Sequence, residues 1–344
     1  MDKVLIRKLL DSGVMVSPDV AGEITERDYD TVLAKKLKTV DKNTLSEIRS
    51  GQGIVIEKPE IARNEITAKD FLNYYKNKIL ALAPFITARL DDKPVSMNRA
   101  RFGQRNTILG LVREPTESGF VLEDLTGHCE VALRTKEDVA ENDVVAATGF
   151  FSDNKLFAER ITHPELTIKK RVRFSEKECS AIFAWAKAGT GNAIKNIANK
   201  KGECFVFIFS GDDRNDGSCA VMRIENGSVT SENVFPNAAK ATITTGNAKF
   251  VLQNLRANHT DGIESQARFF SKRRYIGDDK IAPAFLEDPF VIDQETDIIL
   301  LGKSDKTGVA NNKGYTFIAV GCADDGEPAV RIDLKTRSAE MTSF

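Results

Sequence analysis

A single carboxylate, Asp212, is the first candidate for chemistry in this chain because of what precedes it. The segment Phe205–Gly217, FVFIFSGDDRNDG, opens with an unbroken apolar run that ends at a Ser-Gly pair. Such a run is typical of a strand buried on both faces, as in a sheet covered by helices. Open α/β sheets bind ligands just past the carboxyl ends of their strands, so Asp212 is a candidate metal ligand. Asp212, Asp213 and Asn215 also suit a capped turn, and both interpretations stay open at this point.

The composition is that of a globular protein and excludes several functional classes. The 344 residues are 41% hydrophobic and 29% charged, and 49 basic against 50 acidic side chains leave a formal net charge of −1. That balance argues against a protein that coats nucleic acid through bulk charge. The five cysteines form no CxxC pair, which fits a reducing cytosol and gives no zinc site. No apolar run reaches the ~20 residues of a membrane helix, so we expect a cytoplasmic protein without membrane contact.

The patterns along the chain predict a multidomain α+β protein. Residues 1–50 predict a small helical unit. Residues 51–94 predict a tether and an entry helix that begins at a capping box formed by Thr67 and Asp70. Residues 95–166 contain five short strands separated by turns, which predict a small closed barrel of the oligonucleotide-binding type. The strands of this barrel show no evident row of exposed aromatic side chains for base stacking.

Strands and helices alternate in the remaining part, residues 167–344. Several of the expected strands end in a polar residue, as in the two-metal sites of metallophosphoesterases. We therefore expect an α/β sandwich of the metallophosphoesterase type. In addition to the strand that precedes Asp212, we expect strands at 168–174, 241–244, 249–255, 297–301, 315–320 and 329–334, and helices at 180–188 and 193–200.

The order of these segments resembles the small subunit of archaeal family D DNA polymerase and the B subunits of eukaryotic replicative polymerases. The segments FLNYYKNKILALAPFITARL and RNTILGLVREPTESGFVLEDLTGHCEV are similar to that family's entry helix and barrel. The segments RYIGDDKIAPAFLEDPFVIDQETDIILLGKSD and IDLKTRSAEMTSF are similar to the end of its calcineurin-like phosphoesterase domain. The resemblance runs from about residue 67 to the carboxyl terminus. It implies an accessory subunit that supports a catalytic large subunit in DNA replication.

The resemblance also places the family's metal-binding motifs on this chain. Active members hold two metals through an Asp-x-His, a Gly-Asp, a Gly-Asn-His, an isolated His and a Gly-His-x-His. An alternative register would place Asn258 and His259 on the Asn-His motif. The vestigial ligand positions are Asp212, Asn247 and His259, and the substituted positions are Glu176, Glu178, Ala248, Lys303 and Asp305.

These substitutions imply an inactivated phosphoesterase with no cofactor. Two-metal phosphodiester cleavage needs about seven ligand groups around ions ~3.5–4 Å apart, and few of the matched positions keep a ligand. The ammonium group of Lys303 would repel a metal ion and is expected to pair with Asp212 instead. An active enzyme would use Mn²⁺ or Mg²⁺ bound through oxygen ligands. The chain has only three histidines, so a further His-rich site is excluded.

Because we expect no catalytic activity, we expect the protein to function by binding partners through its surface. The expected partner is the catalytic large subunit, and DNA is contacted through that complex at the nucleoid of a prokaryotic cytosol. Candidate contact surfaces are the apolar segment 283–290 and the outer face of the barrel. The alternatives are an active 3′–5′ proofreading nuclease of the same polymerase and a free-standing single-stranded DNA-binding protein. The basic side chains that could meet DNA or a partner, or form a solvated face, are Lys169, Lys170, Arg171, Arg173, Lys272, Arg273 and Arg274.

Overall fold

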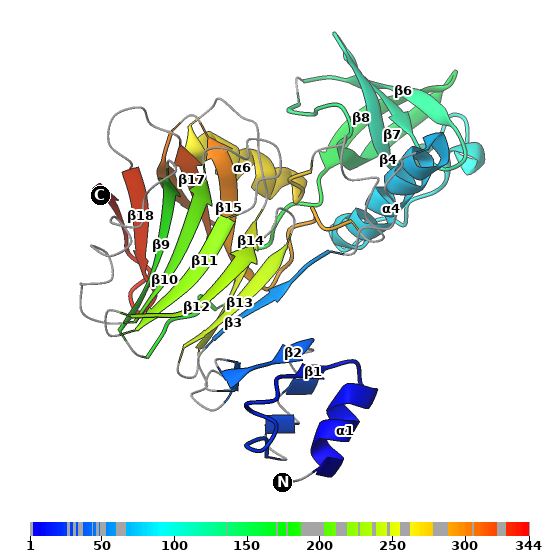
Figure 1. Ribbon diagram of the computed structural model, residues 1–344. Helices are drawn as coiled ribbons and strands as arrows, with labels where there is room; N and C mark the ends of the chain where they lie inside the picture. Colours follow the sequence, from blue (N-terminus) through cyan, green and yellow to red (C-terminus); the bar gives the residue numbers. More distant parts are fainter. Residues whose placement is uncertain are drawn as a thin grey trace. The chain divides into compact units, whose positions relative to one another are not determined.

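The protein combines two six-stranded sheets, a closed five-stranded barrel and few helices, which confirms a mixed α+β architecture (Figure 1). Backbone contacts divide it into a sandwich unit (residues 1–58, 169–264 and 295–344) and a barrel unit (residues 59–168 and 265–294). The described part of the chain contains no helix that is long and apolar enough to cross a membrane. The computed structural model describes residues 3–25, 28–29, 32–33, 37–42, 44–45, 48, 53–59, 67–135, 137–169, 171–176, 178–186, 203–210, 219–225, 228–235, 239–245, 248–254, 262–277, 288–304, 306–321 and 328–343.

Two mixed sheets form the sandwich unit. The first has the strand order β12-β11-β10-β9-β18-β19, and the second has the order β16-β17-β15-β14-β13-β3. The strands of the first sheet are β9 (Cys179–Ala186), β10 (Glu203–Ser210), β11 (Cys219–Glu225), β12 (Ser228–Phe235), β18 (Pro328–Asp333) and β19 (Ala339–Ser343). The strands of the second sheet are β3 (Gly53–Glu57), β13 (Lys240–Thr245), β14 (Ala248–Asn254), β15 (Thr296–Ser304), β16 (Gly308–Asn312) and β17 (Tyr315–Gly321).

Strand β10 is buried on both faces, as its unbroken apolar sequence predicts. The side chains of Phe205, Phe207 and Phe209 enter the hydrophobic core that the two sheets share. The intervening side chains, including Val206 and Ile208, belong to a second buried cluster on the other face of the same sheet. Because both alternating sets of a strand are covered, β10 is a central structural strand of its sheet.

Strand β9 replaces a predicted helix, and the described residues of the segment 168–174, where a strand was expected, form no strand. The Ala-rich sequence CSAIFAWA was expected to be helical, but its residues alternate between two environments. Ala181 and Phe183 enter the core between the sheets, and Ile182 and Ala184 enter the cluster on the other face. This period of two is that of a strand buried on both sides. The helix predicted at 193–200 lies outside the described residues.

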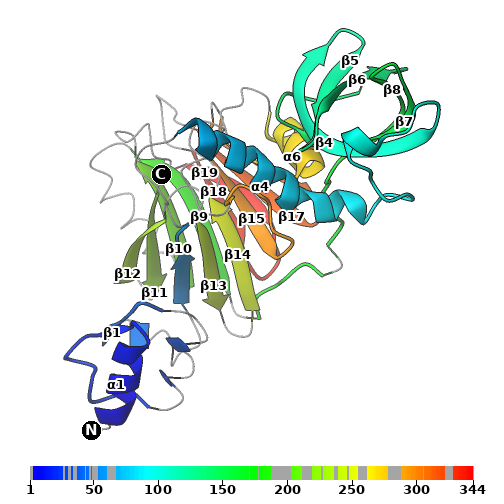
Figure 2. The ribbon, with the colours of Figure 1, turned by 90° about the vertical axis from the view of Figure 1, so that its right-hand side faces the viewer.

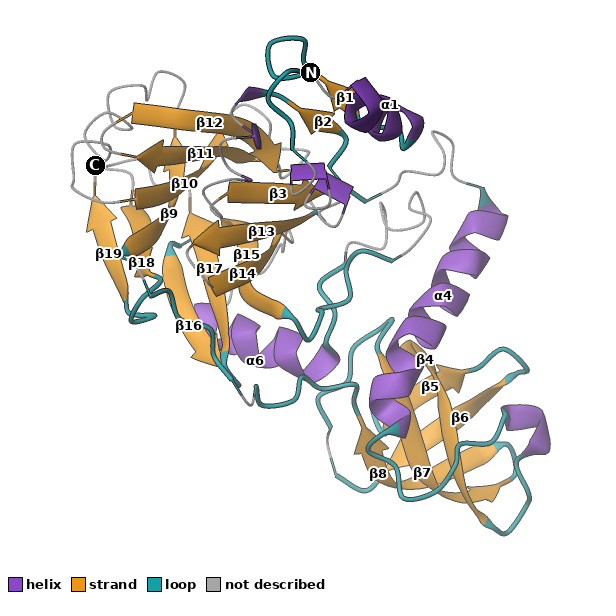
Figure 3. Ribbon diagram, turned by 90° about the horizontal axis from the view of Figure 1, so that it is seen from below, coloured by secondary structure: helices purple, strands orange, loops and turns teal. Residues whose placement is uncertain are grey.

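The barrel unit contains the closed barrel that the sequence predicts. Its strands, in the order β4-β5-β6-β8-β7, surround a core of eleven buried residues that includes Ile108, Phe120 and Leu156. Helix α4 (Ala68–Thr87) begins at the predicted capping box and contacts β4 and β7 (Figure 3). The strands are β4 (Arg105–Thr116), β5 (Gly119–Glu123), β6 (His128–Leu133), β7 (Val144–Ser152) and β8 (Lys155–Thr162), and a short 3-10 helix, η1 (Met97–Arg99), precedes them.

The remaining elements are few. Near the amino terminus, helix α1 (Lys3–Asp11) and a two-stranded parallel sheet of β1 (Met15–Val16) and β2 (Thr39–Val40) enclose a small apolar core. Helix α6 (Ile263–Arg273), which the sequence pattern does not predict, links β14 to the segment before β15.

Candidate functional site

The strand directions locate the predicted metal positions relative to one another. Strands β9 and β10 are parallel, with Cys179 beside Glu203 at one end and Ala186 beside Ser210 at the other. Glu176 and Glu178 precede β9, so they lie at the end of the sheet opposite Ser210. An eight-residue strand spans roughly 23 Å between its first and last Cα atoms. A metal ion held by groups that follow Ser210 is therefore out of reach of both glutamates. The placement of the Asp-x-His motif on these residues depended on the strand expected at 168–174.

The position of Asn247 has a similar consequence. Strands β13 and β14 are antiparallel and pair through Thr245 and Ala248, so Gly246 and Asn247 are the whole connection between them. Two-residue connections rich in Gly and Asn are typical of β-hairpins. Strand β14 is parallel to β15, so the residues that follow both strands start from the same edge of the sheet. The Asn-His pair at 258–259 of the alternative register follows β14 in the sequence and lies outside the described residues.

Six of the fifteen predicted site residues lie where the structure does not describe side chains. Among the described residues, no group of three or more His, Cys, Asp and Glu side chains is placed to hold a metal ion. The expected Lys303–Asp212 ion pair and the expected absence of a cofactor stay predictions. The residues concerned are Asp212, Asn247, His259, Asp305 and Lys170, together with the side chain of Lys303.

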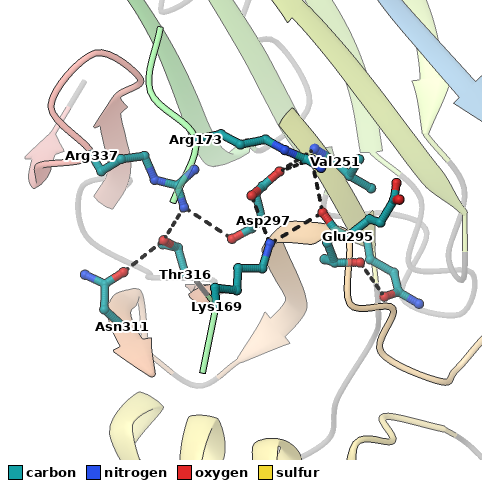
Figure 4. Close-up of polar contacts among 10 residues, drawn as sticks. Lys169, Arg173, Val251, Glu295, Asp297, Asn311, Thr316 and Arg337 are labelled. Atoms are coloured by element: carbon teal, nitrogen blue, oxygen red, sulfur yellow. Dashed lines mark hydrogen bonds and ion pairs between the residues drawn. The ribbon is translucent and has the colours of Figure 1, made fainter. Parts of the chain in front are cut away.

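A buried carboxylate at the start of β15 binds the side chains of Lys169 and Arg173 (Figure 4). Asp297 is 1% exposed and lies 3.0 Å from Lys169 Nζ and 2.8 Å from Arg173 Nη1. Its Oδ2 atom also accepts the amide N–H of Val251 at 3.0 Å, and its backbone carbonyl accepts a hydrogen bond from Arg337 Nη2 at 3.2 Å. We call these five residues the Asp297 cluster. It attaches the segment that enters the sandwich unit to the second sheet.

Within the Asp297 cluster, the charges of Lys169 and Arg173 are paired with Asp297, whereas Arg337 Nη1 is buried without a hydrogen-bond partner among the described residues. Burial lowers the pKa of Lys169, and the ion pair with Asp297 opposes that effect. Burial likewise lowers the pKa of Arg337. Lys169 Nζ also lies 4.8 Å from the centre of the Tyr315 ring. Lys169 and Arg173 were candidate contacts for DNA or a partner, but the contacts they make here are internal.

The basic residues at 272–273 also bind carboxylates of their own unit. Arg273 Nε lies 2.9 Å from Asp143 Oδ1, and both side chains are buried. Burial raises the pKa of Asp143, and Arg273 opposes that effect. The guanidinium group also contacts Asp138 at 3.1 Å and lies 3.5 Å from the centre of the Phe269 ring. Lys272 Nζ donates a hydrogen bond to the Asp138 carbonyl at 3.0 Å. These contacts attach the end of α6 to the segment that leads into β7.

Arg274 is fully buried, so its side chain is not part of the surface of this chain. Its guanidinium group lies 3.5 Å from the centre of the Phe85 ring, and Nε donates a hydrogen bond to the Ile292 carbonyl at 3.0 Å. In the segment 283–290, Phe290 is buried rather than exposed. Arg171 is exposed and is the candidate basic residue that makes no ion pair within the described part of the chain.

A histidine at the end of the barrel is buried in neutral form. His163 is 8% exposed, and neither ring nitrogen has a hydrogen-bond partner among the described residues. Its pKa is lowered from 6.5 to about 3, chiefly because burial penalises the imidazolium ion and further because Lys272 and Arg273 are close. Asp138 and Glu165 oppose this effect only in part.

The burial of His163 leads to a prediction about how the stability of the protein depends on pH. The unfolded state binds more protons than the folded state between pH 6.5 and about 3, so stability is fully present above this window and is lost as the pH falls through it. We expect the free energy of unfolding to be about 2 kcal/mol lower at pH 5 than at pH 7 from this group alone. The variant His163→Gln should lose that part of the pH dependence in urea denaturation followed by circular dichroism. A His163→Gln profile equal to the wild type would contradict the assignment.

The outer face of the barrel carries aromatic side chains that the sequence analysis did not detect. Phe102, Phe150 and Phe157 are 69%, 48% and 49% exposed. The sequence GFFS in β7 does not reveal this face. One phenylalanine of the pair, Phe151, packs against the barrel core, and the other, Phe150, is exposed. The expectation that the barrel has no row of exposed aromatic residues is therefore wrong.

Comparison with known proteins adds one related protein. No protein-family model matches the chain. The chain is 27% identical over 161 residues to the "DNA polymerase II small subunit" of Archaeoglobus fulgidus. That relative is a polymerase small subunit. The match covers 38% of this chain and 33% of the relative, so the chain spans about a third of the length of the protein it matches.

Proposed function

We propose that this protein is a non-catalytic accessory subunit of a replicative DNA polymerase, of the small or B type. The observation that carries the proposal is its similarity to the polymerase small subunit of Archaeoglobus fulgidus. The closed barrel followed by a β-sandwich supports it, because the resembled family places an oligonucleotide-binding barrel before a phosphoesterase domain. The partner is then the catalytic large subunit in the cytoplasm.

We further propose that the phosphoesterase site is inactive. The two glutamates at 176 and 178 lie at the wrong end of their sheet for a site beyond Ser210, and Asn247 belongs to a two-residue hairpin connection. The candidate ligands that remain, Asp212 with Asn258 and His259, fall well short of the roughly seven that two metal ions need. The competing function is a metal-dependent proofreading nuclease at the same residues.

Affinity purification of the tagged chain from its native cell tests the proposed function. We expect the catalytic large subunit of a DNA polymerase to co-purify, and its absence would contradict the proposal. A separate assay measures release of nucleotides from labelled DNA in the presence of Mn²⁺. We expect no release above background; nuclease activity that disappears in the variant Asp212→Ala would establish the nuclease instead.

A further inference from the structure

We infer that the outer face of β7 and β8 is a stacking surface for single-stranded DNA. Phe150 and Phe157 are direct partners in the antiparallel pair of the neighbouring strands β7 and β8 (Figure 2), and both side chains are exposed. Directly opposed residues have Cβ atoms about 5 Å apart, which places the two rings side by side. Both rings are about half exposed, at 48% and 49%. Aromatic faces of this kind bind successive bases without sequence preference.

A third ring extends this surface toward the segment before β4. Phe102 is 69% exposed, and the next residue, Gly103, donates its amide N–H to the Phe151 carbonyl at 2.8 Å. The buried side chain of Asn106 donates hydrogen bonds to the carbonyls of Arg101 and Gln104, at 3.0 and 2.8 Å. The segment is thus held in one conformation beside β7. We call Phe102, Phe150 and Phe157 the aromatic face.

The charges around the aromatic face favour a strand with a phosphate backbone over a partner of other chemistry. Arg105, which pairs with Phe150 across β4 and β7, is already bound by Asp92 at 2.6 Å and Glu159 at 3.2 Å. Arg99 and Arg101 are exposed and form no ion pair within the described residues. Exposed guanidinium groups on residues 99 and 101, close in sequence to Phe102 and without ion pairs in the described part of the chain, supply the positive charge that a strand of alternating phosphates and bases needs.

This inference goes beyond the proposed function, because the contact belongs to the barrel and needs no catalytic subunit. It also uses residues other than the basic side chains with internal contacts, which are Lys169, Arg173, Lys272, Arg273 and Arg274. The test therefore uses the full chain alone, and its outcome is independent of whether a polymerase subunit co-purifies.

Fluorescence anisotropy with a labelled oligomer of about 16 deoxythymidylates, at about 50 mM salt, measures the binding. We expect the wild type to bind and the double variant Phe150→Ala/Phe157→Ala to bind at least tenfold more weakly, since each stacked base contributes about 1–3 kcal/mol. The matched control is Phe174→Ala, which removes a phenyl ring of similar exposure, 52%, from the sandwich unit and should leave binding unchanged.

The arginine pair gives a second test that does not alter the strands. The variant Arg99→Gln/Arg101→Gln should weaken binding and reduce the slope of log affinity against log salt by about 1.4. No binding by the wild type, or unchanged binding by both double variants, would overturn the inference. Tighter binding of an RNA oligomer than of the DNA oligomer would also overturn the inference. Equal binding of a DNA duplex would overturn it as well, because paired bases offer no free faces for stacking. Loss of a protein partner in the phenylalanine variant, with oligonucleotide binding intact, would assign the aromatic face to that partner instead.

Discussion

The variant Asp297→Asn is expected to lower the free energy of unfolding of the sandwich unit by about 3 kcal/mol or more. The substitution keeps the shape of the side chain but leaves the ammonium of Lys169, which is 8% exposed, without its counter-charge. Breaking a buried ion pair from one side is strongly destabilising because the remaining charge stays desolvated. Urea denaturation followed by fluorescence measures the effect, since the single tryptophan, Trp185, belongs to β9 of this unit.

Two matched variants identify the cause of that loss. The ion pair of Arg331 and Glu340 joins β18 to β19 in the same unit, and its side chains are 35% and 64% exposed. The variant Glu340→Gln should therefore change stability by less than about 1 kcal/mol. Adding Lys169→Met to Asp297→Asn should recover part of the loss, because the unpaired charge is then removed. A loss for Asp297→Asn no larger than that for Glu340→Gln would contradict the assignment of a buried ion pair.

The variant Phe207→Ala is expected to lower the free energy of unfolding by about 3–5 kcal/mol. Phe207 is fully buried in the core between the two sheets. Its ring centre lies 4.7 Å from that of Phe183 on β9 and 6.1 Å from that of Phe235 on β12. Removing the ring leaves a cavity that its neighbours on β9 and β12 cannot close without moving the sheet.

The same fluorescence measurement on two further variants distinguishes the loss of core packing at Phe207 from the general effect of removing a phenylalanine ring. The variant Phe207→Leu fills most of the space and should cost less than Phe207→Ala. The exposed Phe174 provides the control, since Phe174→Ala should change stability by no more than about 0.5 kcal/mol. Equal losses for Phe207→Ala and Phe174→Ala would show that the strand is not a central element of this unit.

The barrel could be predicted from the sequence because its signals are local. Strands β5, β6 and β8 largely alternate buried and less buried residues, β4 and β7 contain continuous apolar runs, and the capping box of α4 spans only four residues. Strand β10 was predictable for a similar reason, since a short unbroken run of large apolar residues is compatible with few structures other than a buried strand. These elements depend little on what the rest of the chain does.

The candidate sites could not be predicted in the same way. The sequence of β9 is rich in alanine, and only the covering of both its faces makes it a strand, which a single segment does not reveal. Arg173 and Asp297 are 124 residues apart, so their ion pair depends on the parallel pairing of strands rather than on spacing. Hydrophobic periodicity also does not show which phenylalanine of the pair at 150–151 points outward from a barrel.

Co-expression of the chain with the catalytic large subunit of its cell's DNA polymerase tests the proposed function most directly. Size-exclusion chromatography with light scattering would measure the mass of what elutes. A complex of defined stoichiometry, from which neither chain separates on dilution, is the result that an accessory subunit predicts. Separate elution of the two chains at their own masses, with polymerase activity unaffected by this chain, would contradict it.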